Sequence, residues 1–130
     1  MKKLFLIFFL VNFLSCRKQD NSFSIVGNWE LRKLEGGIIA EVDYPPGTGP
    51  IYSFTTDGKF TYSLHNTVNN SGSYALKPSF VAGNWILKLT GDVRNGNSID
   101  TVTLTKDYLT FLPFANCCDI AAMVYERIHF

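Results

Sequence analysis

Short runs of alternating apolar and polar residues follow one another along most of the chain, from residue 26 onward. They are rich in Thr, Tyr, Phe, Ile, Val and Trp, and Gly, Asn, Asp and Pro separate them, which is typical of strands joined by turns. Almost no helical periodicity is present, so we expect an all-β domain. The pattern predicts eight strands, at residues 27–34, 51–56, 59–64, 72–77, 85–90, 99–105, 108–112 and 122–128.

The short connections between these runs predict that consecutive strands are antiparallel neighbours. Asp57-Gly58 supplies the positive φ angles of a two-residue hairpin, and residues 69–72 and 94–97 have the composition of further turns. An eight-stranded meander that closes on itself is an up-and-down β-barrel, which leaves no strand edge free. We therefore expect a barrel. A two-sheet sandwich would show the same alternation and is the alternative fold.

The alternation also predicts which side chains face the interior. Trp29 and Leu31 share one face of the first strand, and most later strands carry a similar one-sided apolar set. We expect Glu30, Asp100 and Glu126 to face outward. Such an interior is either packed by its own side chains or lined for a ligand.

The connection at residues 36–50 is longer and richer in Gly and Pro than a tight hairpin. It carries Ile38, Ile39 and Tyr44 among its apolar residues. Long connections of this kind often form lids or binding loops. A binding loop at the mouth of the barrel and a plain surface loop are equally consistent with this composition.

The first sixteen residues carry a different pattern. Two lysines precede an apolar run at residues 4–14, and Ser15 and Cys16 follow it, which is the layout of a secretory signal. The run is too short for a membrane span, which needs about 20 apolar residues. An ordinary signal that is cut elsewhere, leaving Cys16 incidental, is the alternative.

The small residue followed by Cys16 resembles the signal of bacterial lipoproteins. The resemblance implies that residues 1–15 are removed, that Cys16 is acylated (with palmitate among its chains), and that lipid anchors the protein to a membrane of the cell envelope. Arg17 after the cysteine favours the outer over the inner membrane by the same resemblance. Residues 16–25, mostly polar, would form a flexible tether, and residues 26–130 one domain.

The net charge of the chain without its signal argues against one class of partner. The signal holds two of the twelve basic residues and none of the eleven acidic ones, so the remainder carries a net charge of −1. Nucleic-acid binding needs a clear basic excess, so we expect no nucleic-acid partner. We expect a monomer.

Candidate chemistry is sparse. Adjacent Cys117 and Cys118 can form a strained vicinal disulfide in an oxidising compartment or stay as free thiols. With only His65 and His129 as histidines, we expect no metal site and no cofactor. No nucleophile elbow or phosphate loop is present, so we expect no enzyme. Catalysis would need His65 or the cysteine pair in a pocket.

The motif Gly27-Asn28-Trp29 at the start of the first strand resembles the lipocalin signature. In that family the Trp plugs the closed end of an eight-stranded barrel, an Arg of the last strand packs across it, and an Asp lies in a nearby turn. The resemblance assigns these roles to Trp29, Arg127 and Asp107. The chain is short and has no helix after the last strand, which is more similar to compact lipocalin-like domains of bacterial lipoproteins.

Two functions follow from this resemblance. The first is binding of a small apolar ligand inside the barrel, with Tyr62, Tyr74, Trp85 and Leu87 lining the cavity. The second is a filled barrel that acts as a structural, protein-interaction or inhibitor module of the cell envelope. It would expose an apolar patch on the connection at residues 36–50.

Overall fold

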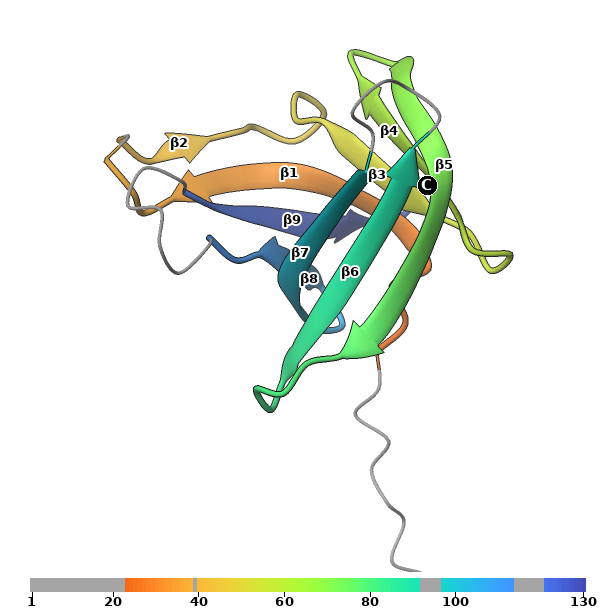
Figure 1. The fold of residues 1–130 in the computed structure, drawn as a ribbon. Coiled ribbons are helices and arrows are strands. Elements are labelled where there is room, and N and C mark those ends of the chain that lie inside the picture. Colours follow the sequence, from red (N-terminus) through yellow and green to blue (C-terminus); the bar gives the residue numbers. More distant parts are fainter. Residues whose placement is uncertain (1–22, 39, 92–96, 114–120) are drawn as a thin grey trace, which may run out of the picture.

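The computed structural model describes residues 23–38, 40–91, 97–113 and 121–130, and this part of the chain is all-β (Figure 1). Each of the eight expected strands has a counterpart, and a ninth strand of two residues lies in the connection after the first. The strands are β1 (Gly27–Glu35), β2 (Val42–Asp43), β3 (Ile51–Phe54), β4 (Lys59–Leu64), β5 (Thr67–Pro78), β6 (Asn84–Gly91), β7 (Asn97–Leu104), β8 (Tyr108–Phe111) and β9 (Ala122–Ile128).

The sheet closes on itself. Strands β3 to β9 are consecutive antiparallel neighbours, and β9 returns to pair with β1. On its other edge β1 pairs with β3 through its first half and with β2 through its second half. The result is the expected closed, eight-stranded antiparallel barrel, and the sandwich alternative is wrong.

The two ends of the barrel are distinct. At the end that we call the closed end, β1 begins and the β3–β4, β5–β6 and β7–β8 turns lie. At the opposite, open end lie the β4–β5 turn and the connection from β1 to β3. The described N-terminal segment runs to β1 at the closed end (Figure 1).

One expected turn is wrong. Residues 69–72 lie inside β5, and the β4–β5 turn is made by His65 and Asn66, with φ of 49° and 62°. Two consecutive positive φ angles are what a two-residue hairpin turn requires. The expected turn at 94–97 falls mostly outside the described residues, and Asn97 begins β7.

The interior is a continuous apolar core that follows the strand alternation. Its buried members come from seven strands and from Ile25 just before β1, and partly buried side chains such as Leu34 and Leu104 pack against them. The largest fully buried side chains are Trp29, Phe54, Phe60, Leu87, Leu109 and Val102.

One acidic residue faces the opposite side from the expected one, and a second lies on the expected side but is buried. Asp100 faces the interior, because it lies directly opposite fully buried Leu87 in the β6–β7 ladder and opposed residues share a face. Glu30 lies on the outer side of β1 but is only 2% exposed. The chain entering β3 covers it, and the Gly49 N–H donates a 3.2 Å hydrogen bond to its carboxylate.

Candidate functional site

Trp29 plugs the closed end of the barrel. Its side chain is fully buried, and its indole N–H donates a 2.7 Å hydrogen bond to the carbonyl oxygen of Ile25. The guanidinium carbon of Arg127 lies 4.1 Å from the centroid of the Trp29 ring. Partial burial lowers the pKa of Arg127 below its ordinary value. The attraction between the guanidinium and the indole offsets part of that desolvation.

Gly27 and Asp107 adjoin this pair. A Cβ at Gly27 would lie 2.6 Å from Nη1 of Arg127, and its φ of 138° is one that residues other than glycine rarely adopt. The backbone N–H of Arg127 donates to the carbonyl oxygen of Asp107 at 2.8 Å. The Arg127 side chain donates to three more carbonyl oxygens, at 2.5, 2.7 and 2.8 Å, those of Ser24, Val26 and Lys106. This end is therefore a hydrogen-bonded plug.

The ring of Tyr52 lies at the centre of an aromatic cluster inside the barrel. Two of its neighbours, Phe54 and Phe111, are stacked with it, and the other three are tilted. The ring centroids lie 4.8–6.3 Å from that of Tyr52 and belong to Phe54, Phe60, Tyr62, Phe111 and Tyr125. Packing of this kind stabilises the core beyond the area it buries.

The four side chains expected to line a cavity do not share one environment. Leu87 is fully buried, and Tyr74 and Trp85 pack against the core. The Tyr74 ring meets Phe54 edge-on, and its hydroxyl donates a 2.8 Å hydrogen bond to the carbonyl oxygen of Thr55. Only Tyr62 belongs to the aromatic cluster around Tyr52, with 4.8 Å between the ring centroids.

Polar groups converge beside this cluster, on the side of the open end. They are the hydroxyls of Tyr44, Tyr52, Tyr62 and Tyr125, which we call the tyrosine group, together with Asp100. Burial raises the pKa of Tyr125 and Tyr52 far above the ordinary value of a phenol, and the neighbouring hydroxyls and Asp100 add to the rise. The two phenols therefore stay neutral at physiological pH and can donate hydrogen bonds.

Within the described part of the chain, the hydroxyls of Tyr52, Tyr62 and Tyr125 take part in no hydrogen bond, and the only enclosed side-chain nitrogen or oxygen without one is Nη1 of Arg32. Tyr125 as a whole is 2% exposed, and Tyr52 and Tyr62 are partly buried, but their hydroxyl oxygens are not enclosed, so water or a bound molecule can reach them. Buried polar groups are nearly always hydrogen-bonded, to protein, water or a bound molecule. Asp100 receives one hydrogen bond, 2.7 Å from the Ser98 hydroxyl, and its second oxygen is a further acceptor.

Tyr44 reaches this group from the long connection after β1. Its backbone N–H donates a 2.8 Å hydrogen bond to the carbonyl oxygen of Arg32, and the adjacent β2 pairs with β1. The connection is thus a loop at the mouth that contributes one tyrosine to the interior. Ile38 on the same loop is 77% exposed, and Ile39 lies outside the described residues.

Sequence reasoning missed most of this site. Tyr52 and Asp100 lie two residues from buried Phe54 and Val102 of the same strands, and Tyr125 is the buried residue of β9, so the strand periodicity is the available signal. Asp100 was assigned outward because charged residues usually are. The proximity of residues from four strands and a loop has no signature in the sequence.

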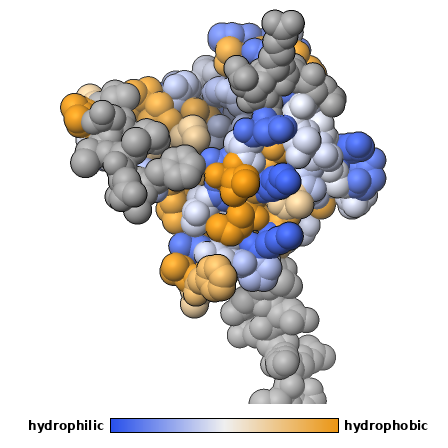
Figure 2. All heavy atoms as spheres, viewed as in Figure 1, coloured by the Kyte–Doolittle hydropathy of each residue, from blue (hydrophilic) through white to orange (hydrophobic). Residues whose placement is uncertain are grey.

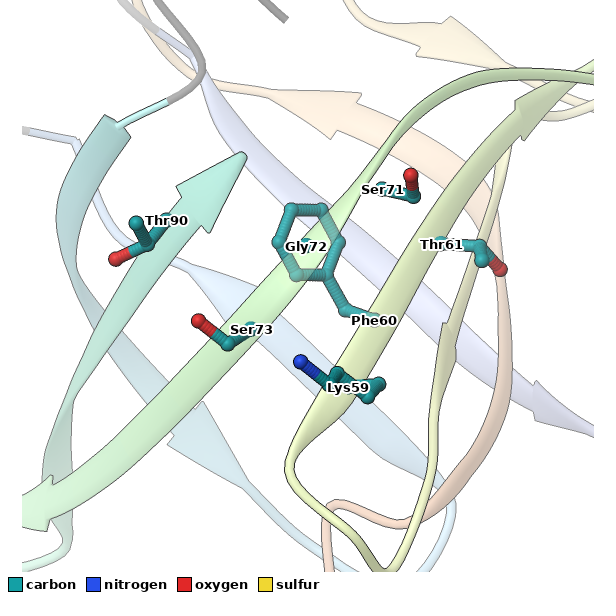
Figure 3. A pocket seen from close by; sticks show the side chains of 7 residues that line it. All are labelled: Lys59, Phe60, Thr61, Ser71, Gly72, Ser73 and Thr90. Atoms are coloured by element: carbon teal, nitrogen blue, oxygen red, sulfur yellow. The ribbon is translucent and has the colours of Figure 1, made fainter. Parts of the chain in front are cut away.

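One hollow lies on the outer wall of the barrel. It has a volume of about 370 Å³, and Lys59 and four hydroxyl side chains of β4, β5 and β6 line it. Figure 3 shows these side chains around Gly72, with the ring of Phe60 behind that glycine. A Cβ at Gly72 would lie 2.0 Å from the carbonyl oxygen of Thr90, so β5 and β6 approach closely there.

The remaining candidate residues for catalysis or metal binding are the two histidines and the three cysteines. His65 lies in an exposed turn beside an outer hollow of about 210 Å³, and His129 is exposed. No group of three or more His, Cys, Asp or Glu within the described ranges could hold a metal ion. Cys16, Cys117 and Cys118 lie outside those ranges. No helix among the described residues is long and apolar enough to span a membrane.

Comparison of the chain with known proteins found no matching family model, no matching curated protein and no matching solved structure.

Proposed function

We propose that this protein is a lipid-anchored, lipocalin-like barrel of the bacterial cell envelope that binds a small, mainly apolar ligand at the open end of its interior. The closed barrel and the contact of Arg127 with Trp29 at its closed end support the lipocalin-like assignment. The basic start, apolar run and Cys16 support export and acylation. In this proposal the barrel binds its ligand and catalyses no reaction.

The tyrosine group carries the proposal. Its hydroxyls stand beside apolar rings, and three of them have no hydrogen-bond partner among the described residues. A ligand with an apolar body and a polar end would suit both parts of this site. The phenols would donate to its polar end, and Asp100 would accept from any donor that it carries.

Native mass spectrometry of the full mature protein, purified from membranes in detergent, tests ligand binding. We expect a reproducible additional mass on the wild-type protein, and its loss from a Tyr52→Phe, Tyr125→Phe double variant. Tyr108→Phe is the matched control, because Tyr108 lies on the barrel surface and is 47% exposed. The control should keep the additional mass.

A wild-type protein that carries no additional mass would favour the second candidate, a filled barrel that acts through its surface. The rings packed around Tyr52 and the exposed Ile38 are the observations that favour this candidate.

The anchor is tested separately. The N-terminal peptide of the mature protein should begin at Cys16 and carry the mass of acyl chains. Fractionation of the envelope should place the protein in the outer membrane. An N-terminus elsewhere, or an unmodified Cys16, would contradict the anchor and would leave ligand binding as an independent question.

A further inference from the structure

One outer face of the barrel is apolar and basic. On β5, β6 and β7, Ala75, Ile86 and Ile99 line a hollow of about 330 Å³ together with Lys77 and Lys88. Ile99 is 60% exposed. Figure 2 shows hydrophobic residues on the molecular surface with strongly hydrophilic side chains beside them.

The lysines of this face lack acidic partners. The only acidic residue in β5, β6 and β7 is Asp100, and it faces the interior. Within the described ranges Lys77 and Lys88 form no ion pair. This face therefore presents positive charge that the described part of the barrel does not neutralise.

The opposite face shows the contrast. There Arg32 lies 3.0 Å from the Glu30 carboxylate and 2.8 Å from that of Glu126. Lys33 lies 3.2 Å from the carboxylate of Glu35 and 3.4 Å from that of Glu41. The basic groups of β1 are thus paired with acidic groups of the same chain.

The apolar character continues onto the β5–β6 turn, which lies at the closed end. Phe80 is fully exposed and Val81 is 60% exposed. Hydrogen bonds of 3.0 and 3.1 Å, from the N–H of Ser79 to the carbonyl of Asn84 and from the N–H of Asn84 to the carbonyl of Val81, hold the turn. A hydrogen-bonded turn that exposes an aromatic and a branched side chain to solvent is typical of an interaction surface.

The position of the N-terminus indicates what this surface meets. The described chain begins at Phe23 and passes through buried Ile25 into β1 at the closed end. Phe23 follows Cys16 by seven residues, which span at most about 25 Å when fully extended. An acylated Cys16 would therefore hold the closed end close to the bilayer.

We propose that the β5–β6 turn and the adjoining face of β5, β6 and β7, which we call the membrane-facing surface, contact the lipid bilayer. The proposal rests on the acylation of Cys16. Phe80 and Val81 enter the headgroup region, and Lys77 and Lys88 meet anionic headgroups with their alkyl stems along the apolar hollow. The barrel thereby holds a defined orientation, beyond what a tether alone would give.

A matched pair of tryptophan variants tests this orientation. Val81 and Val68 are 60% and 59% exposed and lie near turns at opposite ends of the barrel. Each full-length variant, Val81→Trp or Val68→Trp, is purified from membranes and reconstituted into vesicles of phosphatidylethanolamine and phosphatidylglycerol with brominated acyl chains. Bromine quenches the fluorescence of an indole that reaches the acyl region.

We expect the emission added by Val81→Trp to be blue-shifted and mostly lost in brominated vesicles, and that added by Val68→Trp to be unchanged. Replacing phosphatidylglycerol with phosphatidylcholine should weaken the quenching of Val81→Trp. Adding Lys77→Gln and Lys88→Gln should remove this dependence on the anionic lipid. Equal quenching of the two variants, or none in either, would overturn the proposal.

The mass of the N-terminal peptide is measured on the same samples. An acylated protein whose Val81→Trp emission is not quenched keeps the anchor and overturns the membrane-facing surface. An unmodified Cys16 with quenched Val81→Trp emission overturns the anchor and supports direct contact of this surface with lipid. The two proposals therefore fail separately.

Discussion

The polar side chains at the two ends of the barrel interior differ in their hydrogen bonding. At the closed end, the indole N–H of Trp29 and the guanidinium of Arg127 all donate to backbone carbonyls. Toward the open end, the hydroxyls of Tyr52 and Tyr125 bond to no described residue and are not enclosed. A satisfied polar group stabilises a fold, whereas an unsatisfied one costs stability unless water or a ligand completes it. The closed end therefore stabilises the fold, whereas the tyrosine group is the site of the ligand binding that we propose.

Trp29→Ala should have the largest effect on stability. It removes the fully buried plug, and a large cavity of this kind costs about 3–5 kcal/mol of unfolding free energy. Urea denaturation followed by circular dichroism measures the loss. Trp85→Ala is the comparison, because Trp85 is only partly buried near the same end and should cost clearly less. Equal losses would show that the plug has no special role.

Gly27→Ala should come next, at about 1–3 kcal/mol, because φ at this position is positive and the new methyl would meet Nη1 of Arg127. The same substitution should cost less in an Arg127→Ala background, where the guanidinium is gone. A double-mutant cycle measures the difference. Additive losses would mean that the guanidinium does not require glycine here.

Alkaline pH should weaken the open end. Because the pKa values of Tyr52 and Tyr125 are raised in the folded protein, their contribution is fully present below the unfolded phenol pKa of about 10. It falls as the pH rises further, by up to about 1.4 kcal/mol per pH unit for each tyrosine. Urea midpoints across this range measure the slope. The Tyr52→Phe, Tyr125→Phe double variant should flatten it, and Tyr108→Phe should not.

The smallest effect on stability is expected from single removal of a tyrosine hydroxyl. Tyr125→Phe should change the unfolding free energy by less than about 1 kcal/mol, since no described residue bonds to that hydroxyl. Tyr74→Phe should cost about 1 kcal/mol, because it removes the bond to Thr55. A larger loss for Tyr125→Phe than for Tyr74→Phe would contradict the contrast between the two ends of the interior.

Much of the barrel could be predicted from local pattern. The strand at residues 59–64 has the same bounds in the structure, because its alternation and the Asp57-Gly58 turn are both local signals. The β4–β5 turn was misplaced, because Asn69, Asn70 and Gly72 are turn-forming residues that β5 accommodates. There the backbone of β6 leaves no room for a Cβ at Gly72. The composition of a segment does not report such a contact.

The sequence by itself determined which residues form strands, which side of each strand is apolar, and the Trp29 and Arg127 that meet at the closed end. Only the tertiary structure decided the burial of Glu30 beneath Gly49 and the meeting of Tyr44, Tyr52, Tyr62 and Tyr125 beside Asp100. The reason is physical. Alternation encodes the face of a side chain, whereas its neighbours depend on strand order, register and bulges, such as those between Leu31 and Lys33 and between Tyr62 and Ser63.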